Sequence, residues 1–414
     1  MKKGWEIIKL GDIVDTINGL WTGKKEPYIS VKVYTMSNFT KDCEINYSKE
    51  PREIQASISQ YEKRKLIKGD LLLEKSGGGP NQPVGRVIHF DIENDENNTF
   101  SNFTTRLRLN EKFQKIVDSD YIHKYLKLIY INGGTERFQN NSTNIRNLQL
   151  KDYLQIQIPL PSLHEQKRIV NILDKAFAEI TQAKANAEQN LKNTKELFES
   201  YLNGIFENKG DDWEAKKLID VTIKIGSGAT PRGGKASYKE EGISLVRSMN
   251  VHDFDFKEKN LAFIDDKQAD GLSNVILEKN DVLLNITGAS IARCCIIPEK
   301  YLPARVNQHV SIIRVKQDLV FPLFLNSLLV SNYYKKQILE TGEQGATRQA
   351  ITKAQIENFI VYLPKTVEEQ KKLVQELNQL KIETKKLELI YQQKLDNLEE
   401  LKKSILQKAF NGEL

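Results

Sequence analysis

The stretch Leu160–Lys167, LPSLHEQK, recurs as Leu363–Lys371, LPKTVEEQK. Each copy contains the pattern S/T-x-x-E, which begins at Ser162 in the first copy and at Thr366 in the second. In such a capping box the hydroxyl accepts a hydrogen bond from the amide three residues on, while the glutamate reaches back to the first amide. These bonds satisfy donors that the first turn of a helix leaves unpaired. Two helices are therefore expected to begin at matching positions of a repeated sequence.

Matched motifs in the same order precede both stretches, which indicates an internal repeat. Trp5–Leu10 is answered by Trp213–Leu218, and Lys68–Leu73, KGDLLL, by Lys279–Leu284, KNDVLL. The separations between matched motifs differ by only a few residues. The chain is therefore expected to be a duplication in which loop lengths have changed slightly.

Apolar residues after each helix start recur at alternating spacings of three and four, the pattern of a coiled-coil seam. The first seam comprises Ile169, Leu173, Ala176, Ile180, Ala183, Ala187, Asn190, Thr194, Leu197 and Tyr201, and the second comprises Leu373, Leu377, Leu380, Thr384, Leu387, Tyr391, Lys394, Leu398, Leu401 and Ile405. Residues 163–207 as one helix would extend roughly 67 Å, well beyond a domain about 30 Å across. Most of each apolar stripe must therefore pack on another helix. An antiparallel coiled coil is expected, because small residues in the first seam allow the bulkier second seam to approach.

The expected fold class is α+β, with two globular domains of mixed helix and strand content in tandem. They are separated by the two long helices and related by an approximate two-fold axis within the chain. Strands are predicted at residues 71–73, 84–90, 282–286 and 309–315, and helices at 120–129 and 321–329. The predicted boundaries are 1–161 and 209–365 for the globular domains, and 162–208 and 366–414 for the helices.

The composition is that of a soluble globular protein, with 39% hydrophobic and 28% charged residues. No segment approaches the roughly 18 apolar residues of a membrane span, and the N-terminus does not resemble a secretory signal, so a cytoplasmic protein is expected. The net charge of +6 does not by itself demand nucleic acid. Cys43, Cys294 and Cys295 lack the spacing of a zinc site and are expected to be buried thiols.

Motifs for nucleotide binding and catalysis are missing from the sequence. It contains no GxxxxGK[ST], GxGxxG, HExxH or GxSxG, no kinase motifs, and no tetrapeptide of the kind that holds a target amine in methyltransferases. The five histidines stand far apart, so neither catalytic nor metal-binding residues are predicted. The glycine-rich segments Lys75–Pro80, Gly226–Lys235 and Thr287–Ser290 are expected to be turns, with the alternative that their amides meet DNA phosphates.

Side chains suited to base edges recur in predicted loops, because arginine can bind guanine and Asn or Gln can bind adenine through two hydrogen bonds. Most such residues in any protein are only solvated surface groups. The candidates for DNA contact are Lys75, Asn81, Arg86, Arg106, Asn144 and Arg146 in the first domain, and Arg232, Lys235, Arg247, Asn250, Arg293, Arg305, Asn307, Gln308, Arg348 and Gln349 in the second.

The ordered motifs resemble the specificity subunits of type I restriction-modification systems over nearly the whole chain. In the second domain the resemblance rests on Gly226–Pro231, GSGATP; Asp281–Gly288, DVLLNITG; Val306–His309, VNQH; and Gly345–Arg348, GATR. The first domain has a variant pattern in Lys68–Gly79 and Pro83–Arg86. Divergent domains fit this family, because each reads a different half-site.

This resemblance implies that each globular domain is a target-recognition domain for one half of a bipartite, asymmetric site in double-stranded DNA. The helices would fix the spacing, which is tied to the DNA repeat of about 34 to 36 Å, and would dock two modification subunits. Restriction subunits would complete the complex. S-adenosylmethionine, ATP and Mg²⁺ would be bound by those partners, and this chain would be a non-catalytic DNA-recognition subunit.

Two other functions stay open at this point. A DNA-modifying or DNA-cleaving enzyme with a diverged catalytic site would be active as the purified chain alone. A coiled-coil scaffold for proteins would show no salt-sensitive DNA binding in its assembled complex.

Overall fold

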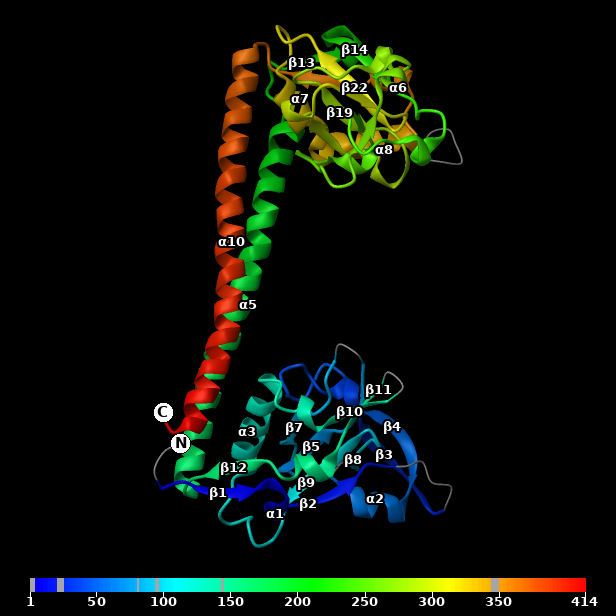
Figure 1. Cartoon of the computed structure of the whole chain (residues 1–414). Helices are drawn as coiled ribbons and strands as arrows, with labels where there is room; N and C mark the ends of the chain where they lie inside the picture. Colours follow the sequence, from blue (N-terminus) through cyan, green and yellow to red (C-terminus); the bar gives the residue numbers. More distant parts are fainter. Residues whose placement is uncertain (1–3, 21–25, 80–81, 94–96, 143–144, 344–349) are drawn as a thin grey trace. The chain divides into compact units, whose positions relative to one another are not determined.

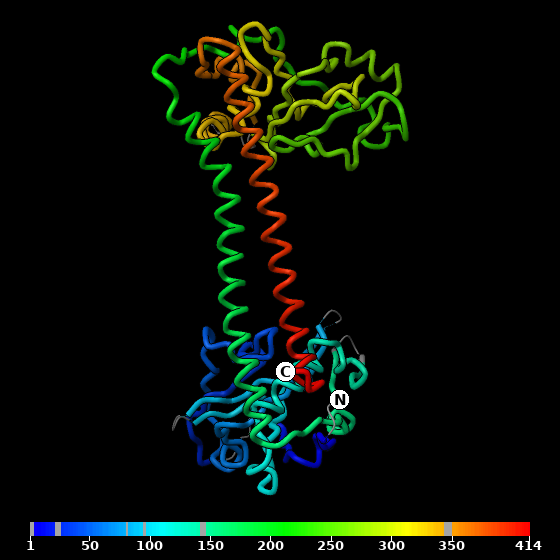
Figure 2. Tube along the Cα trace, turned by 90° about the vertical axis from the view of Figure 1, so that its left-hand side faces the viewer, coloured from blue at the N-terminus to red at the C-terminus, as the bar shows by residue number. Residues whose placement is uncertain are grey.

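The computed structural model describes residues 4–20, 26–79, 82–93, 97–142, 145–343 and 350–414. The chain divides into two compact units: unit 1 is Met1–Ala187 with Gln393–Leu414, and unit 2 is Glu188–Gln392. Each unit contains one globular domain and parts of both long helices, α5 (Leu163–Glu207) and α10 (Val367–Asn411). In each unit these helices lie side by side (Figures 1 and 2).

The centre of unit 1 is a four-stranded antiparallel sheet in the order β2-β9-β5-β7. Strand β5 has the unbroken apolar sequence LLL because both of its faces are covered. Leu71 and Leu73 face α3, whereas Leu72 packs in a second cluster with Phe90 and Phe100. The bounds are β2 (Val14–Asn18), β5 (Asp70–Glu74), β7 (Val87–Phe90), β9 (Thr104–Leu109) and α3 (Ser119–Ile131).

Three smaller sheets surround this centre, in the orders β4-β3-β8, β10-β11-β6 and β1-β12. Strands β3 and β8 run parallel, and the other pairs are antiparallel. The remaining bounds in unit 1 are β1 (Glu6–Lys9), β3 (Tyr28–Tyr34), β4 (Arg52–Ser57), β6 (Ser76–Gly78), β8 (Asn98–Phe100), β10 (Gln139–Ser142), β11 (Ile145–Leu148), β12 (Gln157–Leu160), α1 (Leu10–Ile13), α2 (Ile58–Arg64) and α4 (Leu150–Tyr153).

Unit 2 repeats this topology strand for strand in its main sheets. Its four-stranded sheet has the order β14-β22-β19-β20, its three-stranded sheet β18-β15-β21 again contains one parallel pair, and β13 pairs with β23. The bounds are β13 (Glu214–Lys217), β14 (Thr222–Ser227), β15 (Ile243–Val246), β16 (Val251–His252), β17 (Asp255–Phe256), β18 (Ala262–Ile264), β19 (Val282–Asn285), β20 (Cys294–Ile296), β21 (Ala304–Val306), β22 (Val310–Val315), β23 (Ile360–Leu363), α6 (Asp266–Asp270), α7 (Pro322–Val330), α8 (Asn332–Glu343) and α9 (Lys353–Glu357). The predicted α+β class and the repeat are confirmed.

The repeated KGD and KND motifs form the same turn at the start of β5 and β19. The residue before each aspartate has a positive φ, +93° at Gly69 and +70° at Asn280, a conformation that Gly and Asn tolerate best. Each aspartate also binds an arginine of the neighbouring strand through two hydrogen bonds. Asp70 accepts bonds of 2.6 and 2.7 Å from Arg108, and Asp281 accepts bonds of 2.8 and 2.9 Å from Arg314.

The glutamine of the repeated Glu-Gln-Lys motif attaches each long helix to its globular domain. Gln166 is fully buried; its amide oxygen accepts a 2.8 Å bond from the Asp118 amide, and its nitrogen donates to two backbone carbonyls. Gln370 repeats this with the Phe321 amide at 2.8 Å and the Leu319 carbonyl at 3.0 Å. A buried glutamine with both ends satisfied holds the helix start in one orientation.

The hydroxyl bond of both predicted capping boxes is present. The Ser162 hydroxyl accepts from the Glu165 amide at 3.4 Å, and the Thr366 hydroxyl accepts from the Glu369 amide at 3.2 Å. The Glu165 carboxylate also binds Arg168, one turn ahead, at 2.6 and 2.9 Å.

The two helices run antiparallel. In unit 1 the Lys184 ammonium lies 2.5 Å from Glu399, whereas Arg168, earlier in α5, donates to the carbonyl of Leu414 at 2.7 Å. The buried contacts follow the predicted seam at Ile169, Leu173, Ile180 and Ala187, with Ala176 half-buried. The antiparallel coiled coil is therefore confirmed.

The strict alternation of three- and four-residue spacings does not hold over the full length of either helix, and the predicted seam is wrong at several later positions. Asn190 is exposed, and Leu197 and Tyr201 are 50% and 40% exposed. The inward positions are instead Leu191, Phe198 and Leu202, whereas the predicted seam residue Thr194 is buried. In α10, Leu387 and Leu401 are 38% and 46% exposed, while Leu398, Tyr391 and Ile405 stay half-buried, and Leu373, Leu377 and Leu380 are buried or half-buried. A helix with 3.6 residues per turn drifts from a 3.5-residue repeat, so the buried stripe moves by one position.

Candidate nucleic-acid interface

Loops from distant parts of the sequence meet at one end of the four-stranded sheet in each unit, and we call this end the loop face. In unit 1 it contains residues 18–20, 75–79, 101–103 and 146–148; in unit 2 it contains 226–235, 286–293, 306–309 and 350–351. The Lys75 amide donates to the Phe103 carbonyl at 3.0 Å, and its carbonyl accepts from Leu148 at 2.7 Å. The Ile286 backbone makes the same two bonds, with His309 at 3.0 Å and Ile351 at 2.9 Å.

Glycines allow the loops to approach one another this closely. A Cβ atom on Gly19 would lie 1.8 Å from the Ser101 carbonyl oxygen, and one on Gly228 would lie 1.7 Å from that of Val306. Both distances are impossible for non-bonded atoms, so Gly228, the second glycine of the GSGATP segment, is needed for the shape of the loop face. Gly77 and Gly288 occupy matching positions with φ of +103° and +71°. Residues 76–78 form strand β6, which corrects the prediction of a simple turn there.

Several predicted DNA-contact residues are buried and serve the fold. Arg86 is 6% exposed and makes two 2.8 Å bonds to the Glu74 carboxylate. Asn250 is fully buried; its side chain accepts from the Arg247 amide at 3.0 Å and donates to the Lys257 carbonyl at 2.8 Å. Asn38 makes equivalent bonds in unit 1. Arg86 and Asn250 are therefore removed from the set of candidates.

Three more candidates are buried beneath the loop face. Arg106 is 9% exposed and donates to the Lys65 carbonyl at 3.1 Å, and burial lowers its pKa. Arg305 is 8% exposed and donates to two backbone carbonyls. Asn307, 4% exposed, accepts from the His309 amide at 3.0 Å and shapes the turn. Each of these residue types suits a buried backbone contact as well as a base edge, and in this structure each makes the backbone contact.

The other candidates that the structure describes have exposed or half-buried side chains. Lys75 donates to the Asn18 side chain at 2.8 Å, Arg247 donates to the Asn260 carbonyl, and Gln308 accepts from the Thr230 hydroxyl. The accessible set is Lys75, Arg146, Arg232, Lys235, Arg247, Arg293 and Gln308. Asn81, Asn144, Arg348 and Gln349 lie outside the described residues.

Arg86 and Arg293 occupy matching positions but have different surroundings. The Glu74 amide donates to the Arg86 carbonyl at 2.8 Å, and the Asn285 amide donates to the Arg293 carbonyl at 2.9 Å. In unit 1 the Arg86 guanidinium donates to the Phe39 carbonyl at 3.1 Å. In unit 2 the side-chain Nδ2 of Asn285 donates to the Ser248 carbonyl at 2.9 Å. The Arg293 side chain is thus not needed to make the equivalent bond to a backbone carbonyl in unit 2. Within the described part of unit 2 no acceptor binds its guanidinium, which is half-buried at the edge of the loop face.

Phe103 is a surface residue that the sequence did not single out. Its counterpart is His309 of the VNQH motif, because the Ser101 amide bonds to Tyr34 and the Asn307 amide bonds to Val246 at the same point of the parallel strand pair, each at 3.0 Å. The short unmatched sequence SNF hides this equivalence. Only the strand register shows that Phe103 and His309 stand at the same place.

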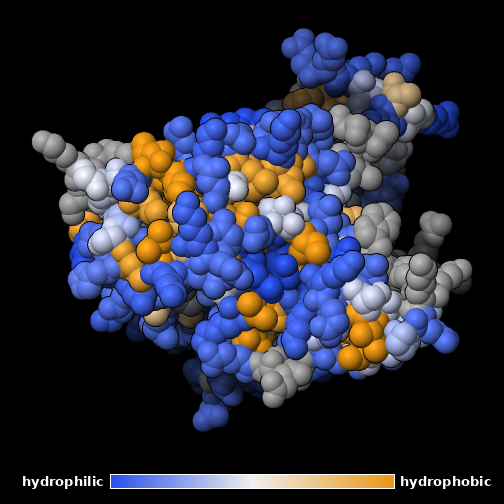
Figure 3. All heavy atoms as spheres, turned by 90° about the horizontal axis from the view of Figure 1, so that it is seen from below, coloured by the Kyte–Doolittle hydropathy of each residue, from blue (hydrophilic) through white to orange (hydrophobic). Residues whose placement is uncertain are grey.

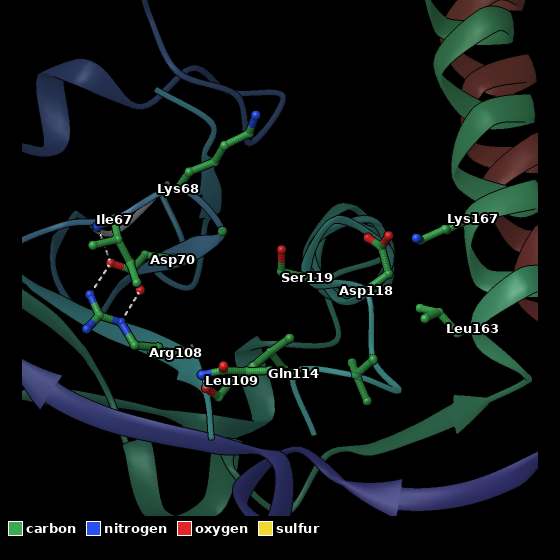
Figure 4. Close-up of a pocket in the computed structure, with 12 residues that line it drawn as sticks. Ile67, Lys68, Asp70, Arg108, Leu109, Gln114, Asp118, Ser119, Leu163 and Lys167 are labelled. Carbon is green, nitrogen blue, oxygen red and sulfur yellow. Dashed lines mark hydrogen bonds and ion pairs between the residues drawn. The ribbon is translucent and has the colours of Figure 1, made fainter. Parts of the chain in front are cut away.

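A polar cavity of about 420 Å³ lies at the other end of the sheet in unit 1, between the starts of β5, α3 and α5 (Figure 4). The Asp70 and Arg108 side chains in it bind each other, and Asp118 caps α3 by accepting from the Asp120 and Tyr121 amides at 2.9 and 3.2 Å. The Lys167 ammonium points from α5 toward Asp118 (Figure 4). Asp70, Arg108 and Asp118 are thus already bonded within the domain, so this cavity is a poor candidate for a ligand site.

No cluster of three or more metal-ligating side chains is present among the described residues. The three cysteines are buried, and burial raises the pKa of Cys43 to about 11 and that of Cys295 to about 12, so both are held as thiols. Within the described ranges no helix has the length and apolarity to cross a membrane. The face seen in Figure 3 shows separate hydrophobic groups among more extensive hydrophilic ones, as on an ordinary solvated surface.

The fold and the two loop faces define a class of protein with two repeated α+β domains, each attached to a pair of long helices. The chain belongs to the family described as the type I restriction modification DNA specificity domain, whose model matches residues 2–191 and again 210–400. The predicted identity and function, a type I specificity subunit with two DNA specificity domains, are confirmed.

Individual relatives agree with this assignment. The chain is 24% identical to the type I restriction enzyme MjaVIII specificity subunit of Methanocaldococcus jannaschii, over 99% of this chain and 93% of that protein. It is 23% identical to the EcoKI specificity subunit of Escherichia coli K12, over 100% and 90%. The crystal structure of the HsdS subunit from Thermoanaerobacter tengcongensis superposes with a TM-score of 0.68 at 18% identity, over 100% of this chain and 98% of that one. A structure from a study of complex assembly and conformational transition of the type I R-M system gives 0.74 at 19%, over 100% and 99%.

Proposed function

We propose that the loop face of each unit reads one half of an asymmetric, bipartite site in double-stranded DNA. One observation carries this proposal: the two loop faces share one backbone frame but present different side chains. Phe103 stands where unit 2 has His309, and the buried Glu74–Arg86 pair stands where unit 2 has Asn285 and an accessible Arg293. A conserved frame with exchanged base-facing groups is what two readers of different sequences require.

We also propose that α5 and α10 set the distance between the two half-sites and dock two modification subunits. Restriction subunits would join the complete complex. Exposed apolar side chains on the helix pair support the docking role, since Ile382, Leu389 and Ile390 are 52%, 63% and 58% exposed.

The chain itself is proposed to be non-catalytic. S-adenosylmethionine would be bound by the modification subunits, and ATP and Mg²⁺ by the restriction subunits. The charged groups that could resemble a catalytic site are engaged in buried ion pairs and helix caps. The accessible cations suit contacts with DNA phosphates and base edges.

Mapping methylated bases tests the whole proposal. The chain is co-expressed with its modification subunit, and the host genome is sequenced by a method that detects modified bases. We expect methylation at one two-part motif with an unread gap, and none when purified chain alone is incubated with DNA and S-adenosylmethionine. Methylation by the chain alone, or marks that follow no two-part motif, would contradict the proposal.

A further inference from the structure

An apolar cavity opens on the loop face of unit 1. Its volume is about 420 Å³, and its walls come from Leu20, Val33, Met36, Ile54 and Phe103, with Gly77 beside the ring. Leu20, Gly77 and Phe103 belong to the loop face, whereas Val33, Met36 and Ile54 come from β3, the turn after it and β4. Phe103 is 48% exposed, so its ring is accessible on the loop face beside this cavity.

A backbone hydrogen bond fixes the main chain of Phe103. The Phe103 carbonyl accepts from the Lys75 amide at 3.0 Å, so the residue is tied to the end of β5. Gly77 has a φ of +103°, and a Cβ added there would already touch the ring at 3.8 Å. The main chain that carries the Phe103 ring is therefore part of the hydrogen-bonded frame of the loop face.

The chemistry of this position differs between the two units. In unit 2 the matching residue is His309, whose Nδ1 lies 2.6 Å from the Thr287 hydroxyl. Unit 1 thus presents an apolar ring and cavity where unit 2 presents a hydrogen-bonded polar group. If the loop faces read DNA, the two positions must recognise different features of a base edge.

We propose that this cavity takes the 5-methyl group of a thymine in the half-site read by unit 1. This inference rests on the proposed function. Among the groups that bases expose in the major groove, the thymine methyl is the apolar one, and it pairs with apolar side chains. Arg52 lines the same cavity and supplies a cation for the neighbouring phosphates.

The expected contribution is that of one buried methyl group. Removing it should weaken binding about four-fold, which corresponds to the roughly 0.8 kcal/mol of a buried CH₂ group. The Phe103→Ala variant should lose this contribution for the natural site, and it should be indifferent to the methyl at the thymine concerned. The Phe103→Leu variant, which keeps an apolar group, should retain most of the discrimination.

The test is a deoxyuridine scan of the methylated motif. Each thymine is replaced in turn by deoxyuridine, which lacks only the methyl, and binding of the complex with modification subunits is measured by fluorescence anisotropy at fixed salt. We expect one position at which the wild type loses about four-fold and Phe103→Ala loses nothing further. Sensitive positions in the other half-site should be unaffected by the Phe103 substitutions and serve as the control.

Three results would overturn the inference: a half-site for unit 1 without thymine, no thymine sensitive to deoxyuridine, or sensitivity that persists unchanged in Phe103→Ala. All three leave the two-part methylation motif in place, so they are distinguishable from failure of the proposed function, in which no such motif is found.

Discussion

At the scale of residues, the duplication provides matched pairs in which one residue type has two roles. Arg86 and Arg293 occupy the same place in the frame, yet Arg86 is buried against Glu74 and Arg293 is accessible. The neighbouring side chain decides the role, because the buried Glu74 carboxylate must be paired with a cation, whereas Asn285 is neutral and its side-chain nitrogen donates to backbone carbonyls.

Alanine at these two positions should have opposite effects. Arg86→Ala leaves the Glu74 carboxylate buried without its cation, so the free energy of unfolding should fall by about 3 kcal/mol or more. Arg293→Ala should change stability by less than about 0.5 kcal/mol and weaken binding to the recognised DNA by about ten-fold. Chemical denaturation and anisotropy on both variants check this. Equal destabilisation by both would show that Arg293 is structural.

At the scale of elements, a regular spacing of apolar residues did not predict the buried face of the helix pair over all forty-five residues of α5. The apolar pattern predicted the start, the direction and the first half of the seam in α5. Beyond Ala187 the predicted Thr194 is buried, but the other three predicted positions are exposed and the residue after each of them turns inward. Near its end α5 packs Leu202 and Phe206 into the core of unit 2. A tertiary contact at the end of the helix thus sets which face is buried there.

Two neighbouring leucines test this shift. Leu202→Asp places a charge in a site that is 4% exposed and should lower the free energy of unfolding of unit 2 by more than about 3 kcal/mol. Leu197→Asp, at a site 50% exposed, should change it by less than about 0.5 kcal/mol. Thermal and urea unfolding of the full chain measure both. If both variants lost a similar amount of unfolding free energy, Leu197 would face the inside of the helix pair, as the original seam predicted.

At the scale of the whole molecule, the proposed spacing role makes a quantitative prediction. One heptad added to each helix lengthens the pair by about 10 Å, close to three base pairs of DNA at 3.4 Å each. A folded variant should methylate the same half-sites with a gap longer by about three base pairs. The motif from modified-base sequencing measures the gap, and circular dichroism controls for folding. An unchanged gap would show that the helices do not set spacing.

The sequence by itself determined the duplication, the helix starts, the α+β class and the family, because these depend on local signals such as caps, periodicity and ordered motifs. Tertiary structure decided which polar residues are accessible. Arg86, Arg106, Asn250, Arg305 and Asn307 looked like base readers and are buried, whereas Phe103 was overlooked and lines a cavity on the loop face. The reason is physical: a side chain that can bind a base edge can equally satisfy a buried backbone group, and only strand register and loop packing determine which partner it meets.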